Sequence, residues 1–244
     1  MIVLVASIAL AQEMTYEGQN SGSAANYVAG KPVAVTHSGG NVSVRCFDTD
    51  TLSARLQYVV TGTAEGPMQA AGNGVGLAVW GDANGGGVKT RTPSKQSGVS
   101  DVDVTLTVNI PRGTSAVTVT QTGRGWVQVL DCSGNVKVSA GAGGAYASGT
   151  LTSATVSASG GDVKVDVDAN TVLKGTTTVS APGGNATLIL APAQGGKLTA
   201  KGEEVSVQQT VMGTNTGTLV QGDMGVAGPA ITVSAKKRAE VTQH

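Results

Sequence analysis

Three aspartates close together in one run have a spacing that could support chemistry. Asp162, Asp166 and Asp168 surround Lys164. Carboxylates on one strand face can hold Ca²⁺ between stacked turns, or serve as the acid pair of a β-helical polysaccharide-cleaving enzyme. Lys164 supplies a counter-charge within the same set, and the Gly-Gly-x-Gly-x-Asp order of Ca²⁺-binding nonapeptides is absent. We therefore expect a solvated strand face, and keep the three aspartates as weak Ca²⁺ candidates.

The chain has only two tryptophans, Trp80 and Trp126. Proteins that handle sugars use aromatic platforms, so both residues are possible ligand contacts. Trp80 lies in the stretch 61–98, where the strand pattern fails and glycines accumulate, which predicts a long surface excursion of the kind that carries function. Trp126 follows the turn Gly123-Arg124-Gly125, and the alternative is that it packs over the first coil of the repeating region.

Catalytic motifs are absent from the sequence. Two histidines, His37 and His244, are too few for a metal site built on several histidines. No nucleophile elbow, zinc-protease helix motif or phosphate-binding loop occurs, and the Ser-x-x-Lys match at Ser234 to Lys237 lacks its companion motifs. His37 is expected to be a turn residue. We predict no catalytic residue, no cofactor and no enzymatic activity.

Cys46 and Cys132 are the only cysteines. An even count in an exported chain favours a disulfide. However, Cys46 is in phase with the inward Val42 and Val44, whereas Cys132 is out of phase with Val127 and Val129. Two unpaired cysteines, one packed as a small hydrophobic side chain and one at a turn, therefore stay open as the alternative.

The elements that position these residues are short runs of alternating apolar and polar residues, each led by glycine. Clear copies are Gly40–Val44, Gly125–Val129, Gly134–Val138, Gly161–Val165, Gly196–Ala200 and Ala230–Val233. Alternation with period two indicates strands with one buried face. A strand of four or five residues cannot bury that face alone, so the units must stack, as in a solenoid or a many-stranded sandwich.

Composition limits the classes of fold and partner. The chain has 244 residues, 40% of them apolar but only 3% aromatic, which is typical of one all-β domain with a narrow core of small side chains. Positive and negative residues number 16 each, so the formal net charge is zero and nucleic acid is not indicated.

The order of segments along the chain indicates export. The apolar run ending in Ala9-Leu10-Ala11 is expected to be a signal peptide (1–11) truncated at its start, because no Lys or Arg precedes it. A flexible leader (12–32) and one domain (33–241) follow. Within the domain the strongest predicted strand covers 101–110 and ends at Pro111-Arg112-Gly113. No run is long enough to cross a bilayer as a helix.

The strand ending Val-Asn-Ile-Pro-Arg-Gly at 108–113, followed by units such as Gly134–Val138 and Gly161–Val165, resembles the bacterial "putative adhesin" family of β-solenoid domains (DUF4097, related to the head GIN domain family). The resemblance covers roughly residues 33–241. It implies an exported right-handed β-solenoid without assigned catalytic residues.

These observations predict an all-β, single-domain β-solenoid, with an antiparallel β-sandwich as the alternative. The predicted function is a non-enzymatic structural or adhesion-type module of the periplasm, cell surface or medium. The alternatives are a carbohydrate-binding module that uses the 61–98 loop and, less favoured, a polysaccharide-processing enzyme. Expected partners are a protein or glycan at the cell surface, with self-association through the solenoid ends as a further option.

Overall fold

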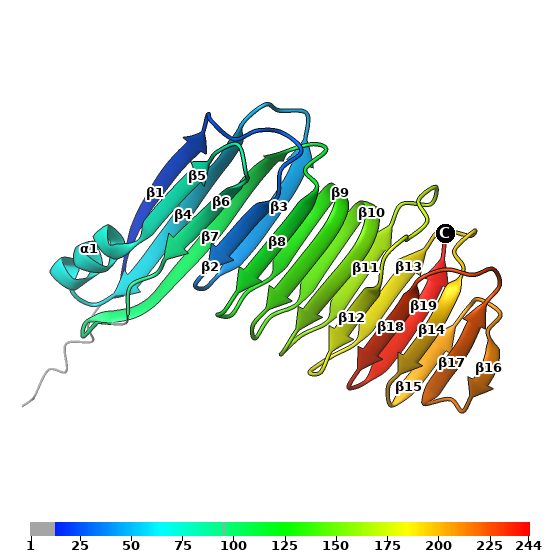
Figure 1. The fold of residues 1–244 in the computed structure, drawn as a ribbon. Helices are drawn as coiled ribbons and strands as arrows, with labels where there is room; N and C mark the ends of the chain where they lie inside the picture. The colour runs from blue at the N-terminus through cyan, green and yellow to red at the C-terminus, as the bar shows by residue number, and fades with distance from the viewer. Residues whose placement is uncertain (1–12, 95) are drawn as a thin grey trace, which may run out of the picture.

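The computed structural model describes residues 13–94 and 96–244, which form one domain of 19 strands and one short helix (Figure 1). The strands belong to a single open network of hydrogen-bonded pairs. Two long strands, β9 (Val127–Ala140) and β10 (Ala145–Ala158), take part in two separate ladders, so one network covers two sides of the molecule. The predicted signal peptide lies outside the described residues.

The two ladders share β9 and β10 and otherwise use different strands. In spatial order, the first ladder contains β5 (Gly76–Gly81), β6 (Gly86–Arg91), β2 (Val33–His37), β8 (Ala116–Gln121), the C-terminal halves of β9 and β10, β12 (Thr177–Ala181), β18 (Ala230–Ala235), β14 (Gly196–Lys201), β17 (Leu219–Met224) and β16 (Met212–Asn215). The second ladder contains β1 (Met14–Ala24), β4 (Leu52–Gly62), β7 (Val99–Pro111), β3 (Asn41–Phe47), the N-terminal halves of β9 and β10, β11 (Val163–Val167), β13 (Ala186–Leu190), β19 (Arg238–Gln243) and β15 (Glu204–Val207).

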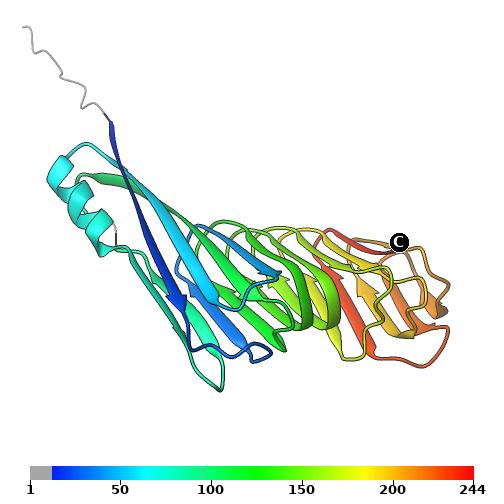
Figure 2. The ribbon, with the colours of Figure 1, turned by 90° about the horizontal axis from the view of Figure 1, so that it is seen from above.

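Parallel pairing fills the interior of both ladders, and antiparallel pairs occur only towards their ends. The antiparallel β-sandwich alternative is therefore wrong for the interior of the domain. Seen from above, successive coils stack along one axis into an elongated rod (Figure 2).

The core follows the alternation that the sequence predicts. Val163 and Val165 on β11 are buried, while Lys164 between them is exposed, and the same pattern recurs on β2, β3, β12 and β13. Valine, alanine and leucine supply most of the buried residues, which form one continuous cluster along the rod. Small side chains suit this arrangement because they allow two ladders to approach closely over a narrow interior.

Two segments are more regular than predicted. Residues 14–24 of the predicted flexible leader form β1, which pairs with β4 along its whole length. The polar β1 could be missed because an edge strand gains its backbone hydrogen bonds without burying a full apolar face. The predicted 61–98 excursion contains α1 (Glu65–Gly74), β5 and β6, and α1 buries Met68 and Ala71 against the end of the core.

Chain order and spatial order differ at both ends of the rod. The pair β2–β3 lies between β6–β7 and β8–β9, although it precedes all four in the sequence. The C-terminal pair β18–β19 likewise lies between β12–β13 and β14–β15. The last strands of the chain are thus interior strands, paired on both edges.

Candidate functional site

A groove lies on the outer face of the second ladder, between two columns of residues in register. The first column lies at the turns that enter the strands and includes Trp126, Gly144 and Asp162. The indole of Trp126 lies against the next coil, where a Cβ on Gly144 would stand 2.4 Å from the ring. Gly144 is therefore required here by the close approach of the tryptophan. Trp126 remains 51% exposed.

The second column lies two residues further along the same strands and contains Gln128, Tyr146 and Lys164. The Lys164 ammonium lies 5.6 Å from the centre of the Tyr146 ring, within the range of a cation–π interaction. The surface between the columns is hollow, and Ala145, which points inward, forms part of the lining.

The hollow has two adjoining parts, of about 490 and 450 Å³, that share Asp162 and Lys164. The first part is lined by Trp126, Gln128 and Tyr146, and the second continues to Asn185 and Glu240. Together they form a groove that crosses β9, β10, β11, β13 and β19 and runs along the axis of the rod. We call it the ladder groove.

The three predicted Ca²⁺ candidates have different partners. The Oδ1 atom of Asp162 accepts hydrogen bonds from the backbone N (2.8 Å) and the Nδ2 (3.1 Å) of Asn185. Asp166 lies 3.8 Å from Lys164 Nζ and 3.1 Å from His244 Nε2. Asp168 accepts a hydrogen bond from Thr150 Oγ1. Within residues 13–94 and 96–244, no group of three or more acidic, histidine or cysteine residues could hold a metal ion.

The two tryptophans lie on different ladders. Trp80 is on β5 of the first ladder, where its ring covers Gly87 of β6, and it is 48% exposed. Trp126 is on the second ladder, at the ladder groove. The structure therefore does not bring the two predicted contact residues together, and only Trp126 lies beside the acidic run.

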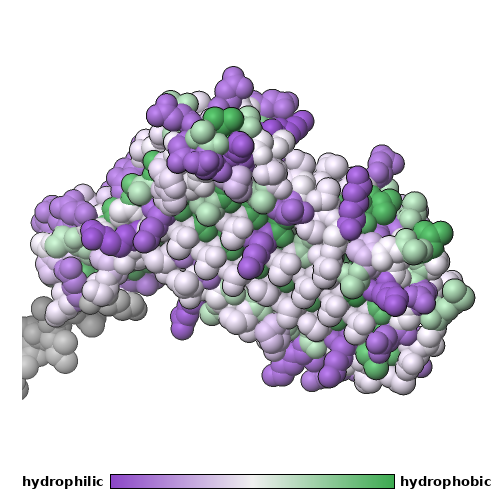
Figure 3. Space-filling model, viewed as in Figure 1, coloured by the Kyte–Doolittle hydropathy of each residue, from purple (hydrophilic) through white to green (hydrophobic). Residues whose placement is uncertain are grey.

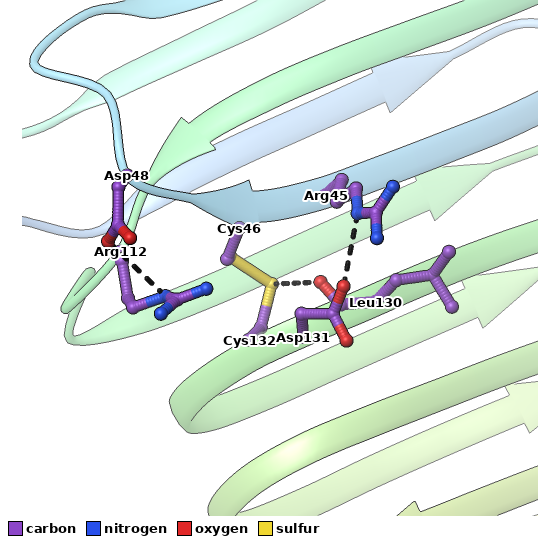
Figure 4. A network of polar contacts seen from close by, with 7 residues as sticks. All are labelled: Arg45, Cys46, Asp48, Arg112, Leu130, Asp131 and Cys132. Atoms are coloured by element: carbon purple, nitrogen blue, oxygen red, sulfur yellow. Dashed lines mark hydrogen bonds and ion pairs between the residues drawn. A yellow bond between two sulfur atoms is a disulfide. The ribbon is translucent and has the colours of Figure 1, made fainter.

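Cys46 and Cys132 are joined by a disulfide that links β3 to β9, with a Cα–Cα distance of 4.9 Å (Figure 4). Cys132 is out of phase with Val127 and Val129 in the sequence, and an irregularity in β9 corrects this mismatch. Asp131 has a positive φ of 58°, and the register with β10 shifts beside it, so that Cys132 turns inward and is fully buried. Asp131 itself points out and pairs with Arg45 at 3.0 Å.

His37, expected to be a turn residue, is instead the buried last residue of β2, directly before a turn. Its Nδ1 lies 2.7 Å from Thr90 Oγ1, and its Nε2 has no hydrogen-bond partner among the described residues. Burial lowers the pKa of His37 to about 4, because the charged imidazolium would lose its hydration. His37 is therefore a residue of the core and not a base exposed at the surface.

Sequence reasoning missed Tyr146, Gln128 and the placement of Lys164 beside them. The signal was present: Gln128, Tyr146 and Lys164 are successive members of an 18-residue repeat, as are Trp126, Gly144 and Asp162. Recognising the length of one coil would have predicted both columns.

No protein-family model and no curated protein sequence matches the chain. A solved structure described as a putative cell adhesion protein from Clostridium sporogenes matches with 13% sequence identity and a TM-score of 0.49, over 95% of this chain and 100% of that chain. A putative adhesin from Bacteroides fragilis matches with 13% identity and a TM-score of 0.42, over 93% of this chain and 97% of that chain. A putative lipid binding protein from Parabacteroides distasonis matches with 9% identity and a TM-score of 0.35, over 93% and 96% of the two chains. With TM-scores below 0.5, no function is transferred from these proteins.

No helix in the described part of the chain is long and apolar enough to span a membrane. On the face shown in Figure 3, hydrophilic side chains are scattered over a surface of intermediate hydropathy, and hydrophobic residues form small, separate patches.

Proposed function

We propose that the chain is a non-enzymatic, exported β-solenoid of the "putative adhesin" (DUF4097) type, a module of the bacterial envelope or surface that attaches to a partner through the ladder groove. The observation that carries this proposal is the groove itself. It is an open site, about 20 Å long, whose side chains are held in register by strands paired on both edges. Such a site binds with little ordering cost because its backbone is already fixed.

Two further observations support an exported role. The Cys46–Cys132 disulfide is of a kind that persists in oxidising compartments and is rare in the cytosol. The polar side chains scattered over the face shown in Figure 3, without a large apolar patch, are compatible with exposure of that face to water. Self-association through the ends of the rod belongs to the same proposal, because β1 and β5 at one end and β15 and β16 at the other are edge strands.

Attachment is tested with beads coated with the purified protein and applied to bacterial cells, isolated envelopes and epithelial cells. Coated beads should be retained on at least one of these surfaces, and Trp126→Ala should reduce retention severalfold. Trp80→Ala is the matched control because Trp80 has nearly the same exposure but lies on the other ladder. Retention no higher than for albumin-coated beads on every surface would contradict the proposal.

A further inference from the structure

The floor of the ladder groove offers no free backbone groups to a partner. Five strands cross it, namely β9, β10, β11, β13 and β19, and each is hydrogen-bonded to a neighbour on both edges. A peptide that binds by adding a strand needs an unpaired edge, which is absent here. A ligand in this groove must therefore be recognised through side chains alone.

The side chains provide two aromatic rings, of which Trp126 is the more exposed and Tyr146 the less, and several hydrogen-bonding groups around them. Trp126 exposes half of its surface, and its position is fixed by contact with Gly144 and by the hydrogen bond from its backbone N to Asn41 Oδ1 (3.0 Å). The amides of Gln128 and Asn185 and the carboxylate of Asp162 line the same groove. A sugar ring matches this combination, because it has C–H groups on its faces and hydroxyl groups around its edge.

The charges of the groove favour a neutral ligand over a polyanion. Lys164 is compensated by Asp166, and Arg238 lies 3.9 Å from Glu204 and 3.4 Å from Glu240. Each cation is thus paired with a carboxylate of the protein and is less available to an anionic chain. Asp162 differs from these residues because one of its two carboxylate oxygens is left without a partner within the described part of the chain.

Only one oxygen of the Asp162 carboxylate, Oδ1, is used by Asn185. Its Oδ2 has no hydrogen-bond or ion-pair partner among the described residues. It can accept a hydrogen bond from a ligand hydroxyl, whereas it would repel a uronate or a sulfate.

The direction of the groove favours a polymer. Four strand spacings separate β9 from β19, which is about 19 Å along the axis of the rod. From these observations we infer that the ladder groove binds a neutral polysaccharide chain lying along the rod, with one sugar ring stacked on Trp126 and a hydroxyl donating to Asp162. This inference rests on the proposed function, since it names the partner chemistry of the same groove.

The test uses the fact that the chain has only two tryptophans. In the Trp80→Phe variant, Trp126 is the only indole and reports directly on the groove. This variant is titrated with soluble neutral polysaccharides (a mixed-linkage β-glucan, a galactomannan and dextran) and with anionic ones (alginate and hyaluronan). At least one neutral chain should produce a saturable change in tryptophan emission, and the anionic chains should produce none.

Variants separate stacking on Trp126 from general adsorption. In affinity electrophoresis of otherwise unchanged protein, Trp126→Ala should weaken binding of the neutral chain by at least about tenfold, and Asp162→Ala by severalfold. Trp80→Ala should leave the affinity within about twofold. Circular dichroism and thermal melting of each variant show whether it is folded, and Trp126→Phe, which keeps an aromatic face, should retain part of the affinity.

Three results would overturn the inference: no neutral chain binds, an anionic chain binds more tightly, or Trp80→Ala weakens binding as much as Trp126→Ala. The bead assay distinguishes this failure from failure of the proposed function. If beads attach through Trp126 to a surface while none of the five polysaccharides binds, the attachment role stands and the glycan inference fails. If beads attach nowhere, the proposed function fails as well.

Discussion

Burial of His37 makes the stability of the domain depend on pH. The folded state holds this imidazole neutral until the pH falls to about 4, whereas in the unfolded chain it takes up a proton near its ordinary pKa of 6.5. Between these values the unfolded state binds more protons, so stability falls as the pH falls. Between pH 7.5 and 5 the loss from His37 alone should be about 2 kcal/mol.

The contribution of His37 is measured by urea denaturation of the wild type and of His37→Gln at pH 7.5 and pH 5. Glutamine keeps an amide that can bond to Thr90 Oγ1 but does not titrate. The variant should lose less stability on acidification than the wild type, by about 2 kcal/mol. Equal losses in the two proteins would show that His37 is not the titrating group, because both retain the same carboxylates.

The Cys46–Cys132 disulfide should also contribute to the stability of the domain. It closes a loop of 86 residues, and by the chain-entropy model this restriction of the unfolded state adds about 4.6 kcal/mol of stability. Replacing both cysteines by alanine should therefore lower the free energy of unfolding by several kcal/mol. Thiol titration of the denatured, unreduced protein from a periplasmic preparation should find no free thiol, and two free thiols would contradict the bridge.

At the scale of strands, the C-terminal pair β18–β19 has an unusual position for the end of a chain. Terminal segments commonly fray, because they are paired on one side or not at all. Here β18 is hydrogen-bonded to both β12 and β14, and Val233 is fully buried. Opening β18 would break two rows of hydrogen bonds and expose the core. The free energy of this opening should therefore be close to that of global unfolding.

Amide hydrogen exchange tests this position. The amides of 231–233 should be protected as strongly as those of 163–165 in β11, although they lie near the end of the chain. The amides of β16 provide the internal comparison, because β16 is an exposed edge strand and should exchange much faster. Exchange of 231–233 at the rate of β16 would show that the inserted pair is not formed.

The sequence predicts the interior strands well because alternation is a local property. The alternation of apolar and polar residues in Val163-Lys164-Val165 is the same whichever strands lie beside it. The structure confirms which of these side chains are buried. Alternation does not say which strand lies beside which, so the insertion of β2–β3 and β18–β19 could not be predicted. It also misses β1, whose stability comes from backbone pairing with β4 rather than from an apolar face.

The candidate site was predictable only in part for the same reason. Trp126 and Asp162 stand out by residue type, but their approach depends on coils of equal length that place residues 18 positions apart in one column. The inward turn of Cys132 depends on the positive φ of Asp131, an aspartate conformation that alternation cannot encode.

For the whole molecule, we propose a rigid rod that binds a partner along its side and does not transform it. The rod holds the ladder groove open and in register, because each strand under it is fixed by two neighbours. The charged groups that line the groove are the carboxylates of Asp162 and Glu240, the ammonium of Lys164 and the guanidinium of Arg238.

The most direct measurement is the release of reducing ends during a long incubation of the protein with neutral and anionic polysaccharides, at concentrations that saturate any binding. We predict no release above that of a buffer control, with the bound chain recovered at its original length. Release of reducing ends that disappears in Asp162→Asn or Asp166→Asn, while both variants stay folded and still bind, would contradict it and identify the protein as an enzyme.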